Sequence, residues 1–440
     1  MKRIISFPTA RRLAPRLPLA AIVLLIGGSF SPSHAQLREH VGKHLTLHTD
    51  LPASEAIEQL PDAFDAAVPQ WCEYFGVDQD IVEGWHVTGY LMSNKQVFAQ
   101  RGLVPSELPD FEHGYQWGDK IWVVGQASEY YTRHLVLHEG VHSAMWRFFG
   151  GAGPAWFMEG TAELLATHHW SDGKMTINVM PDTREAFPFW GRLKVIESAR
   201  RADRALAFDS IMRYSQKAHR QVEPYAWSWA ALTLLEMYPE YRSIAIQAAR
   251  RGSDSSIEFT RRFYDDLKSE WPELSTRWTM LVDGLEYGFD RTRNRIDLNV
   301  SSDNSQAIAS APTSQSYSIK ADHGWQATHF RVASGQTIQI TASGEYTIGN
   351  DPKPWVCQPQ GVTIDYHRGN PLGMVLAAVA PANSTDGTKL SLPQIVGVGR
   401  ERTFQAAHDG LLLIRIGDHP SSLADNQGSA TVNVSTGKQP

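Results

Sequence analysis

The sequence predicts an α+β protein in which a small mixed sheet and a group of helices are followed by an antiparallel β-sandwich. Three observations predict this class. Strand patterns come first, between residues 44 and 126, helical patterns follow from residue 127 to about 290, and alternating strand patterns occupy residues 318 to 436. Strands and helices that occur in separate runs are typical of α+β folds. The length of 440 residues suits two domains.

Residues 1–35 have the pattern of a signal peptide. Five basic residues precede the apolar stretch from Leu17 to Ile26, and Ser33-His34-Ala35 is a small-x-small cleavage site. We therefore expect export to the periplasm or the exterior. The stretch is too short for a membrane span and no later segment is long enough, so the mature chain is expected to lack a transmembrane span. A retained N-terminal anchor and a twin-arginine signal at Arg11-Arg12 are the alternatives.

The charge balance excludes one class of partner. The formal net charge is −6, and removal of residues 1–35 leaves 36 basic against 47 acidic residues, a net charge of −11. An acidic chain of this kind is not expected to bind nucleic acid. The chain has two cysteines, Cys72 and Cys357, whose number and separation exclude a zinc finger. A disulfide between them stays open as an alternative.

Three strands are predicted ahead of residue 127. They are rich in β-branched and aromatic residues and cover 44–49, 85–92 and 120–126. A helix is expected over 53–75 and a short one over 95–100. Together these segments predict a small mixed sheet.

The segment that follows contains an H-E-x-x-H motif, His138-Glu139-Gly140-Val141-His142. Ser128 can cap a helix at its N-terminus, and Gly150-Gly151 can end it. On that helix the two histidines lie one turn apart on the same face, so both imidazoles can reach one Zn²⁺. Glu139 is beside them as a candidate general base.

A second helix is predicted from Pro154, and it carries two glutamates four residues apart. Glu159 can supply the third metal ligand, and Glu163 can hydrogen-bond a ligating histidine from behind. Glu163 is also the alternative ligand. His134 is left out of the metal site, because three histidines spread over two turns of one straight helix do not converge. It could support a ligand, face the substrate or pack.

The remaining helices of this part are predicted from their apolar periodicity, and their aromatic residues are expected to form core. They are 186–202, 206–218, 224–237, 239–251, 256–268 and 271–286.

The amino-acid composition changes at residues 300–317, where serine, asparagine, alanine and proline predict a linker. After it, alternating segments such as Thr337–Ala342, Leu411–Ile416 and Ala430–Val434 are separated by turn signals. This pattern predicts an antiparallel β-sandwich.

The two motifs together resemble the gluzincin clan of metallopeptidases, and most closely the bacterial peptidase MA-like families. The resemblance lies in His138-Glu139-x-x-His142 followed by Pro154-x-Trp156-Phe157-x-Glu159-Gly160-x-Ala162-Glu163. It implies a zincin-like catalytic domain over residues 36–299, in which His138, His142 and Glu159 bind zinc. It also implies that Glu139 is the general base that activates a zinc-bound water to hydrolyse a peptide bond.

The same resemblance implies two further features of the site. The strand before the zinc helix, residues 120–126, would be a sheet edge that pairs with extended substrate. A tyrosine or histidine on a later helix would stabilise the oxyanion, and Tyr225 is the candidate. An aromatic packing residue is the alternative for Tyr225, and His168 or His169 could take its catalytic place.

The C-terminal part, residues 318–440, resembles the galactophilic PA-I type bacterial lectin. The resemblance lies in Gly335-Gln336-x-Ile338-x-Ile340-x-Ala342-Ser343-Gly344, in Asp409-Gly410, and in Gly417-Asp418-His419-Pro420 followed by Asp425-Asn426-x-Gly428. It implies a Ca²⁺ site and binding of a glycan or glycoprotein. The ligands would be the side chains of Asp418, Asp425 and Asn426 and the carbonyls of Ser422 and Ile348. A solvated turn is the alternative.

The sequence thus predicts an exported zinc metallopeptidase that acts on a peptide or protein substrate and carries a lectin-like β-sandwich. Two other functions stay open. One is a zinc hydrolase of a non-peptide amide, such as a cell-wall substrate. The other is a glycan-binding protein with an inactive protease domain, which the intact Glu139 disfavours.

Overall fold

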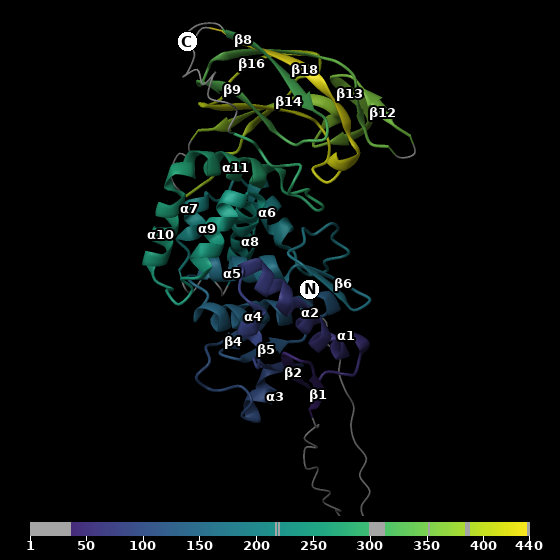
Figure 1. The fold of residues 1–440 in the computed structure, drawn as a ribbon. Coiled ribbons are helices and arrows are strands. Elements are labelled where there is room, and N and C mark those ends of the chain that lie inside the picture. Colours follow the sequence, from purple (N-terminus) through teal and green to yellow (C-terminus); the bar gives the residue numbers. More distant parts are fainter. Residues whose placement is uncertain are drawn as a thin grey trace, which may run out of the picture. The chain divides into compact units, whose positions relative to one another are not determined.

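The computed structural model describes residues 37–215, 218, 221–298, 313–350, 353–382 and 388–437 (Figure 1). By their contacts, residues 37–440 form one compact unit. The predicted signal peptide lies outside the described residues. In the part that is described, no helix is both long and apolar enough to cross a membrane. The predicted α+β class is confirmed, because helices and antiparallel sheets occupy separate stretches of the chain.

Five short strands near the N-terminus form one mixed sheet. Its order is β1-β2-β3-β5-β4, with β2, β3 and β5 parallel and the two outer strands antiparallel to their neighbours. The three predicted strands are present with slightly shifted ends. The bounds are β1 Arg38–Val41, β2 Leu45–Thr49, β3 Val87–Met92, β4 Gly114–Trp117 and β5 Lys120–Val124.

The strand that precedes the histidine helix is not a sheet edge, so that expectation is wrong. β5 pairs with β3 on one side and with β4 on the other. A two-residue turn joins β4 to β5, and Gly118 in this turn has a φ of 59°. Glycine adopts positive φ without strain, which lets the chain reverse here. The outer position therefore belongs to β4.

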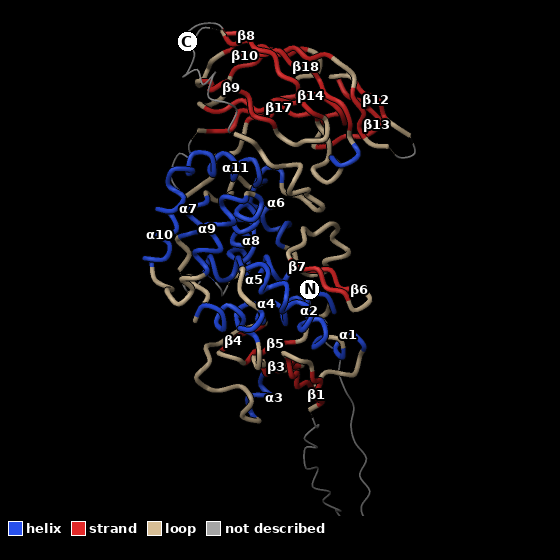
Figure 2. Tube along the Cα trace, viewed as in Figure 1, coloured by secondary structure: helices blue, strands red, loops and turns tan. Residues whose placement is uncertain are grey.

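Helices α2 and α4 pack against this sheet and against each other, and α4 lies along β4 and β5 (Figure 2). The helix expected over 53–75 is divided into α1 and α2. Pro61 lies in the first turn of α2, where its missing N–H group cannot continue the ladder of α1. The bounds are α1 Glu55–Glu58, α2 Leu60–Phe75, α3 Lys95–Gln100 and α4 Glu129–Phe149.

A hairpin and a group of helices follow. All six helices predicted between 186 and 286 are present, but α7 covers only Phe208–Met212 of the predicted 206–218, and α6 begins at Arg192 instead of residue 186. The cause is a run with positive φ at Phe189 and Gly191, which a helix cannot contain. The bounds are α5 Ala155–Ala166, β6 His168–Ser171, β7 Lys174–Ile177, α6 Arg192–Arg201, α7 Phe208–Met212, α8 Val222–Met237, α9 Pro239–Ala249, α10 Ile257–Leu267 and α11 Trp271–Gly284.

The C-terminal strands form two antiparallel sheets around a core of their own, here called the sandwich core, which includes Ile338, Val375, Ile414 and Val432. The first sheet contains β8 Thr313–Lys320, β10 Thr337–Ser343, β11 Tyr346–Ile348, β12 Trp355–Cys357, β16 Glu401–Gln405 and β18 Gln427–Thr436. The second contains β9 Gln326–Val332, β13 Gln360–His367, β14 Asn370–Pro381, β15 Gln394–Gly397 and β17 Gly410–Ile416.

β8 begins at Thr313, inside the predicted linker, and residues 300–312 lie outside the described residues. The division of the chain into domains stays a prediction. A smaller apolar cluster joins the last helix to the second C-terminal sheet through Met280, Trp325 and Leu413.

Both cysteines are free and buried, Cys72 in the large N-terminal core and Cys357 in the sandwich core. The disulfide that the sequence left open is therefore not formed in this structure.

Candidate metal centre

Helix α4 carries the H-E-x-x-H motif through the middle of the N-terminal core. The Ser128 hydroxyl caps the helix by accepting a hydrogen bond from the Tyr131 N–H (3.2 Å), as the sequence predicts. Gly150 ends the helix in the left-handed conformation, with a φ of 74°. His138, Glu139 and His142 are all buried on this helix.

Three nitrogen and oxygen atoms converge beside α4. His138 Nε2 lies 3.1 Å from His142 Nε2 and 3.1 Å from Glu159 Oε2, and His142 Nε2 lies 3.4 Å from the same oxygen. Glu159 reaches this point from α5. The structure therefore brings the three predicted zinc ligands together as a triangle of donor atoms.

The size of this triangle fits a metal ion. Zinc bonds of about 2.0–2.1 Å in a tetrahedral arrangement separate two ligand atoms by about 3.3 Å. The three observed separations lie on either side of that value. Two imidazoles and one carboxylate are also a donor set that zinc prefers, and they leave a fourth position open.

Glu163 lies on the opposite side of His138 from this triangle. Its Oε1 is 3.4 Å from His138 Nδ1, while Nε2 of the same ring faces Glu159. Arg192 donates two hydrogen bonds to Glu163, from Nε (3.0 Å) and from Nη2 (2.8 Å). Burial raises the pKa of Glu163, but the charges of Arg192 and His134 lower it well below its usual value. Glu163 thus lies behind His138, and Glu159 lies in the triangle.

His134 supports Glu163 and does not enter the triangle. Its Nδ1 donates to the Ala166 carbonyl (3.0 Å), and its Nε2 lies 3.5 Å from Glu163 Oε2. His134, His138 and Glu163 also have ligand atoms close enough to hold a metal. That group would use Nδ1 of His138 and would place its ion against the Arg192 guanidinium, so the triangle with Glu159 is the better cation site.

Glu139 lies against the backbone of the sheet's edge strand. A Cβ atom added to Gly114 in β4 would be 2.4 Å from Glu139 Oε1, so the carboxylate occupies space that any larger residue would fill. Burial is the main cause that raises the pKa of Glu139. A carboxyl group with a raised pKa can accept a proton and later return it.

Tyr225 lies near the triangle, in the first turns of α8. Its ring centroid is 5.9 Å from that of His138, and the Arg192 guanidinium lies 5.5 Å from the Tyr225 ring. Close contact between α5 and α8 positions it. A Cβ atom on Gly160 would be 2.6 Å from the Ser228 carbonyl oxygen, so only glycine permits this spacing.

His168 is engaged elsewhere. Its Nδ1 donates to the Ala166 carbonyl (2.8 Å), and its Nε2 accepts from Arg133 Nε (2.8 Å). It therefore has no N–H left for an oxyanion, which favours Tyr225 over His168, and the neighbouring His169 is exposed on β6.

The side chains of the predicted calcium ligands Asp418, Asp425 and Asn426 each accept hydrogen bonds from the protein. Asp418 accepts hydrogen bonds from the His419 N–H (2.7 Å) and from Asn426 Nδ2 (2.9 Å). Asn426 Oδ1 accepts from the Gly349 N–H next to Ile348 (3.1 Å), and Asp425 Oδ2 accepts from the Asn350 N–H (3.1 Å). Ser422 directly precedes the short helix η5, Leu423–Asp425.

A buried cation lies beside this loop. Arg415 donates from Nη2 to the Asp418 carbonyl (2.6 Å), and burial lowers the pKa of its guanidinium to about 10. A second cation at Asp418 would be repelled by this group. The arrangement fits a self-contained hydrogen-bonded loop better than a calcium site, and the calcium prediction stays a prediction.

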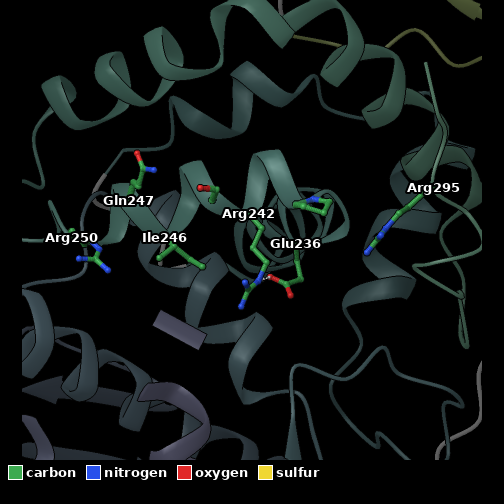
Figure 3. Close-up of a pocket in the computed structure, with 8 residues that line it drawn as sticks. Glu236, Arg242, Ile246, Gln247, Arg250 and Arg295 are labelled. Atoms are coloured by element: carbon green, nitrogen blue, oxygen red, sulfur yellow. Dashed lines mark hydrogen bonds and ion pairs between the residues drawn. The ribbon is translucent and has the colours of Figure 1, made fainter. Parts of the chain in front are cut away.

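A separate hollow of about 680 Å³ lies along α9 and does not involve the predicted site residues. Figure 3 shows Arg242, Arg250 and Arg295 around it. Arg242 Nε is hydrogen-bonded to Glu236 Oε2 (3.1 Å), which neutralises part of its charge. Nothing at this hollow points to a specific ligand.

The sequence did not point to two residues of the candidate site, Gly114 and Arg192. The turn at Trp117-Gly118-Asp119-Lys120 could have indicated the hairpin that brings Gly114 to Glu139. Arg192 gave no signal, because its partner Glu163 lies 29 residues away.

Comparison with known proteins adds little. No family model matches the sequence, and no curated protein matches it. Among solved structures, the N-terminal domain of EclA, a PllA-like lectin, is 20% identical with a TM-score of 0.22, over 28% of this chain and 95% of that one. An IMPa metallopeptidase in complex with T-antigen is 11% identical with a TM-score of 0.18, and the match covers 90% of this chain but only 47% of that one. At TM-scores this far below 0.5, neither likeness supports a function.

Proposed function

We propose that this chain is a zinc-dependent hydrolase of peptide bonds. The observation that carries the proposal is the triangle of His138 Nε2, His142 Nε2 and Glu159 Oε2, whose sides of 3.1 to 3.4 Å match the ligand spacing of tetrahedral zinc. The buried carboxylate of Glu139 lies beside it on the same helix. These four residues are the ligands and the base that such a hydrolase needs.

Zinc bound in this triangle would polarise the scissile carbonyl and lower the pKa of a water molecule. Glu139 then takes the proton of the attacking water and gives it to the leaving amine, and its raised pKa suits both transfers. The hydroxyl of Tyr225 is the proposed donor to the oxyanion that develops. Glu163 orients His138, and Arg192 keeps Glu163 ionised and in place.

The edge strand favours a peptide over another amide. β4 ends the sheet, and at its first residue it contacts Glu139. An extended peptide can add to such an edge through backbone hydrogen bonds, which would bring its carbonyl to the triangle.

Metal content and cleavage of a peptide library test the proposal together. We expect wild-type protein to retain one zinc per chain through dialysis, Glu159→Ala to lose it, and Glu139→Gln to keep it without turnover. Cleavage by Glu139→Gln at the wild-type rate would refute the mechanism. A wild type that retains zinc and releases a product from peptidoglycan, but cleaves no peptide, would favour the non-peptide amide.

The role of the C-terminal sheets as a calcium- and glycan-binding accessory is a second proposal that rests on the sequence pattern alone. Calorimetric titration with Ca²⁺, and then with galactosides, tests it. Heat of binding that is lost in Asp425→Ala would support it, whereas a flat titration would leave these sheets a structural part of the molecule.

A further inference from the structure

A second group of metal-binding side chains lies far along the chain from the H-E-x-x-H motif. It consists of Glu286, just after α11, His367 at the end of β13, and His419 in the loop after β17, and their ligand atoms lie within 4.8 Å of one another. Glu286 Oε2 is 3.1 Å from His367 Nε2, and Glu286 Oε1 is 3.6 Å from His419 Nδ1. The two imidazole centroids are 4.4 Å apart. We call this group the Glu286 cluster.

Neighbouring contacts hold the three side chains in position. The loop of His419 is fixed to the segment after Glu286, because the Pro420 carbonyl accepts hydrogen bonds from the Asp290 N–H (3.1 Å) and from Asn294 Nδ2 (3.0 Å). Gly288 in that segment leaves room for Ser421, whose Cβ would be 2.8 Å from an added Cβ atom. A site that is held rigid before its ion binds loses less entropy on binding.

The hairpin that carries His367 closes through a two-residue turn. His367 pairs with Asn370, and the two turn residues between them, Arg368 and Gly369, have φ values of 50° and 82°. A turn of this kind requires positive φ at both of its central residues, although positive φ is uncommon for arginine. The turn is also held by an ion pair, in which Arg368 Nη1 lies 3.0 Å from Asp283 Oδ2.

The cluster opens to solvent. It lines a hollow of about 970 Å³ between α6 and the hairpin. The side chains of His367, Glu286 and His419 are 14%, 26% and 38% exposed, so an ion and its remaining water ligands can enter. Arg368 opposes a cation, because its Nη2 lies 3.7 Å from Glu286 Oε2.

We propose that the Glu286 cluster is a second zinc site, which joins the end of the helical region to the C-terminal sheets. Two imidazoles and one carboxylate form a donor set suited to zinc. Glu286 faces His367 Nε2 with Oε2 (3.1 Å) and His419 Nδ1 with Oε1 (3.6 Å), so its carboxylate lies against both imidazoles and can share one ion with them. Because Arg368 weakens it, this site fills at higher free zinc than the triangle on α4. The ion is structural, and it does not take part in the hydrolysis proposed above.

Zinc titration of the full mature chain, followed by calorimetry, tests the site. We expect two ions per chain at saturation in wild type, and one in His367→Gln/His419→Gln. The variant His138→Ala/His142→Ala should also bind one, with the weaker affinity. Co²⁺ bound to the His138→Ala/His142→Ala variant should give a visible absorption band, and this band should disappear when His367 and His419 are also replaced.

Arg368→Gln is the matched variant, because it removes the opposing charge and leaves all three ligands. It should tighten the weaker site and leave the stronger one unchanged. If wild type saturates at one zinc, and the His367→Gln/His419→Gln variant still binds that zinc, the second site is overturned and the proposed hydrolase stands. Two ions in that double variant, or an unchanged weaker affinity in Arg368→Gln, would also overturn it.

Discussion

Replacing Gly114 by alanine should disable the proposed base without unfolding the protein. The added Cβ would be 2.4 Å from Glu139 Oε1 and 3.1 Å from its Cδ. Ordinary contact begins near 3.4 Å, so the carboxylate must move by about 1 Å, and a displacement of that size at a reacting group costs about 100-fold in rate. The atoms that move are the end of a flexible side chain, so the free energy of unfolding should change little.

The rate constant kcat/KM on a cleaved library peptide measures this effect, with zinc content and the thermal midpoint measured on the same sample. Gly284→Ala is the control, because a Cβ atom at the end of α11 meets only Phe289 at 3.5 Å. It should match wild type in all three measurements. Wild-type turnover in Gly114→Ala would show that Glu139 does not act from the position seen here.

Three further predictions concern the support of the metal centre. Arg192→Met should lower the free energy of unfolding, measured by denaturant titration, by about 3–5 kcal/mol, because it leaves the Glu163 carboxylate buried without its charge partner. Adding Glu163→Gln should recover part of that loss. Glu163→Gln alone should weaken zinc binding about 10- to 100-fold in competition with a chelator, and an unchanged affinity would mean that the contact with His138 has no influence. Gly160→Ala should lower the free energy of unfolding by about 1–3 kcal/mol, because its Cβ meets the Ser228 carbonyl at 2.6 Å. An unchanged free energy of unfolding in a denaturant titration would contradict this packing argument.

The main helices and the two histidines of the triangle were predictable because their signals are local. Ser128 and Gly150 mark the ends of α4, and the four-residue spacing of His138 and His142 fixes their shared face. Glu159 lies 21 residues from His138, and its role as third ligand is implied by the resemblance to the gluzincin clan. A local pattern therefore decides the spacing of the two histidines but not the position of Glu159 beside them.

What the sequence did not predict depends on contacts across the chain or on very short elements. β4 has only four residues, Gly114–Trp117, which are too few for their alternation to be a signal. The β6–β7 hairpin was missed although Asp172-Gly173, with φ values of 52° and 71°, is a typical two-residue turn. The pairing of Arg192 with Glu163 depends on how α6 packs beside α5, which no local pattern encodes.

The two unpaired cysteines give this chain a built-in pair of reporters. One thiol lies in each of the two larger cores, and burial raises the pKa of Cys72 and raises that of Cys357 to about 11. An alkylating reagent reaches a buried thiol only when the surrounding core opens, so the labelling rate at each cysteine measures the opening of that core alone. Equal rates would mean that the two cores open together in one cooperative unit, and unequal rates would rank their local stabilities without any engineered probe.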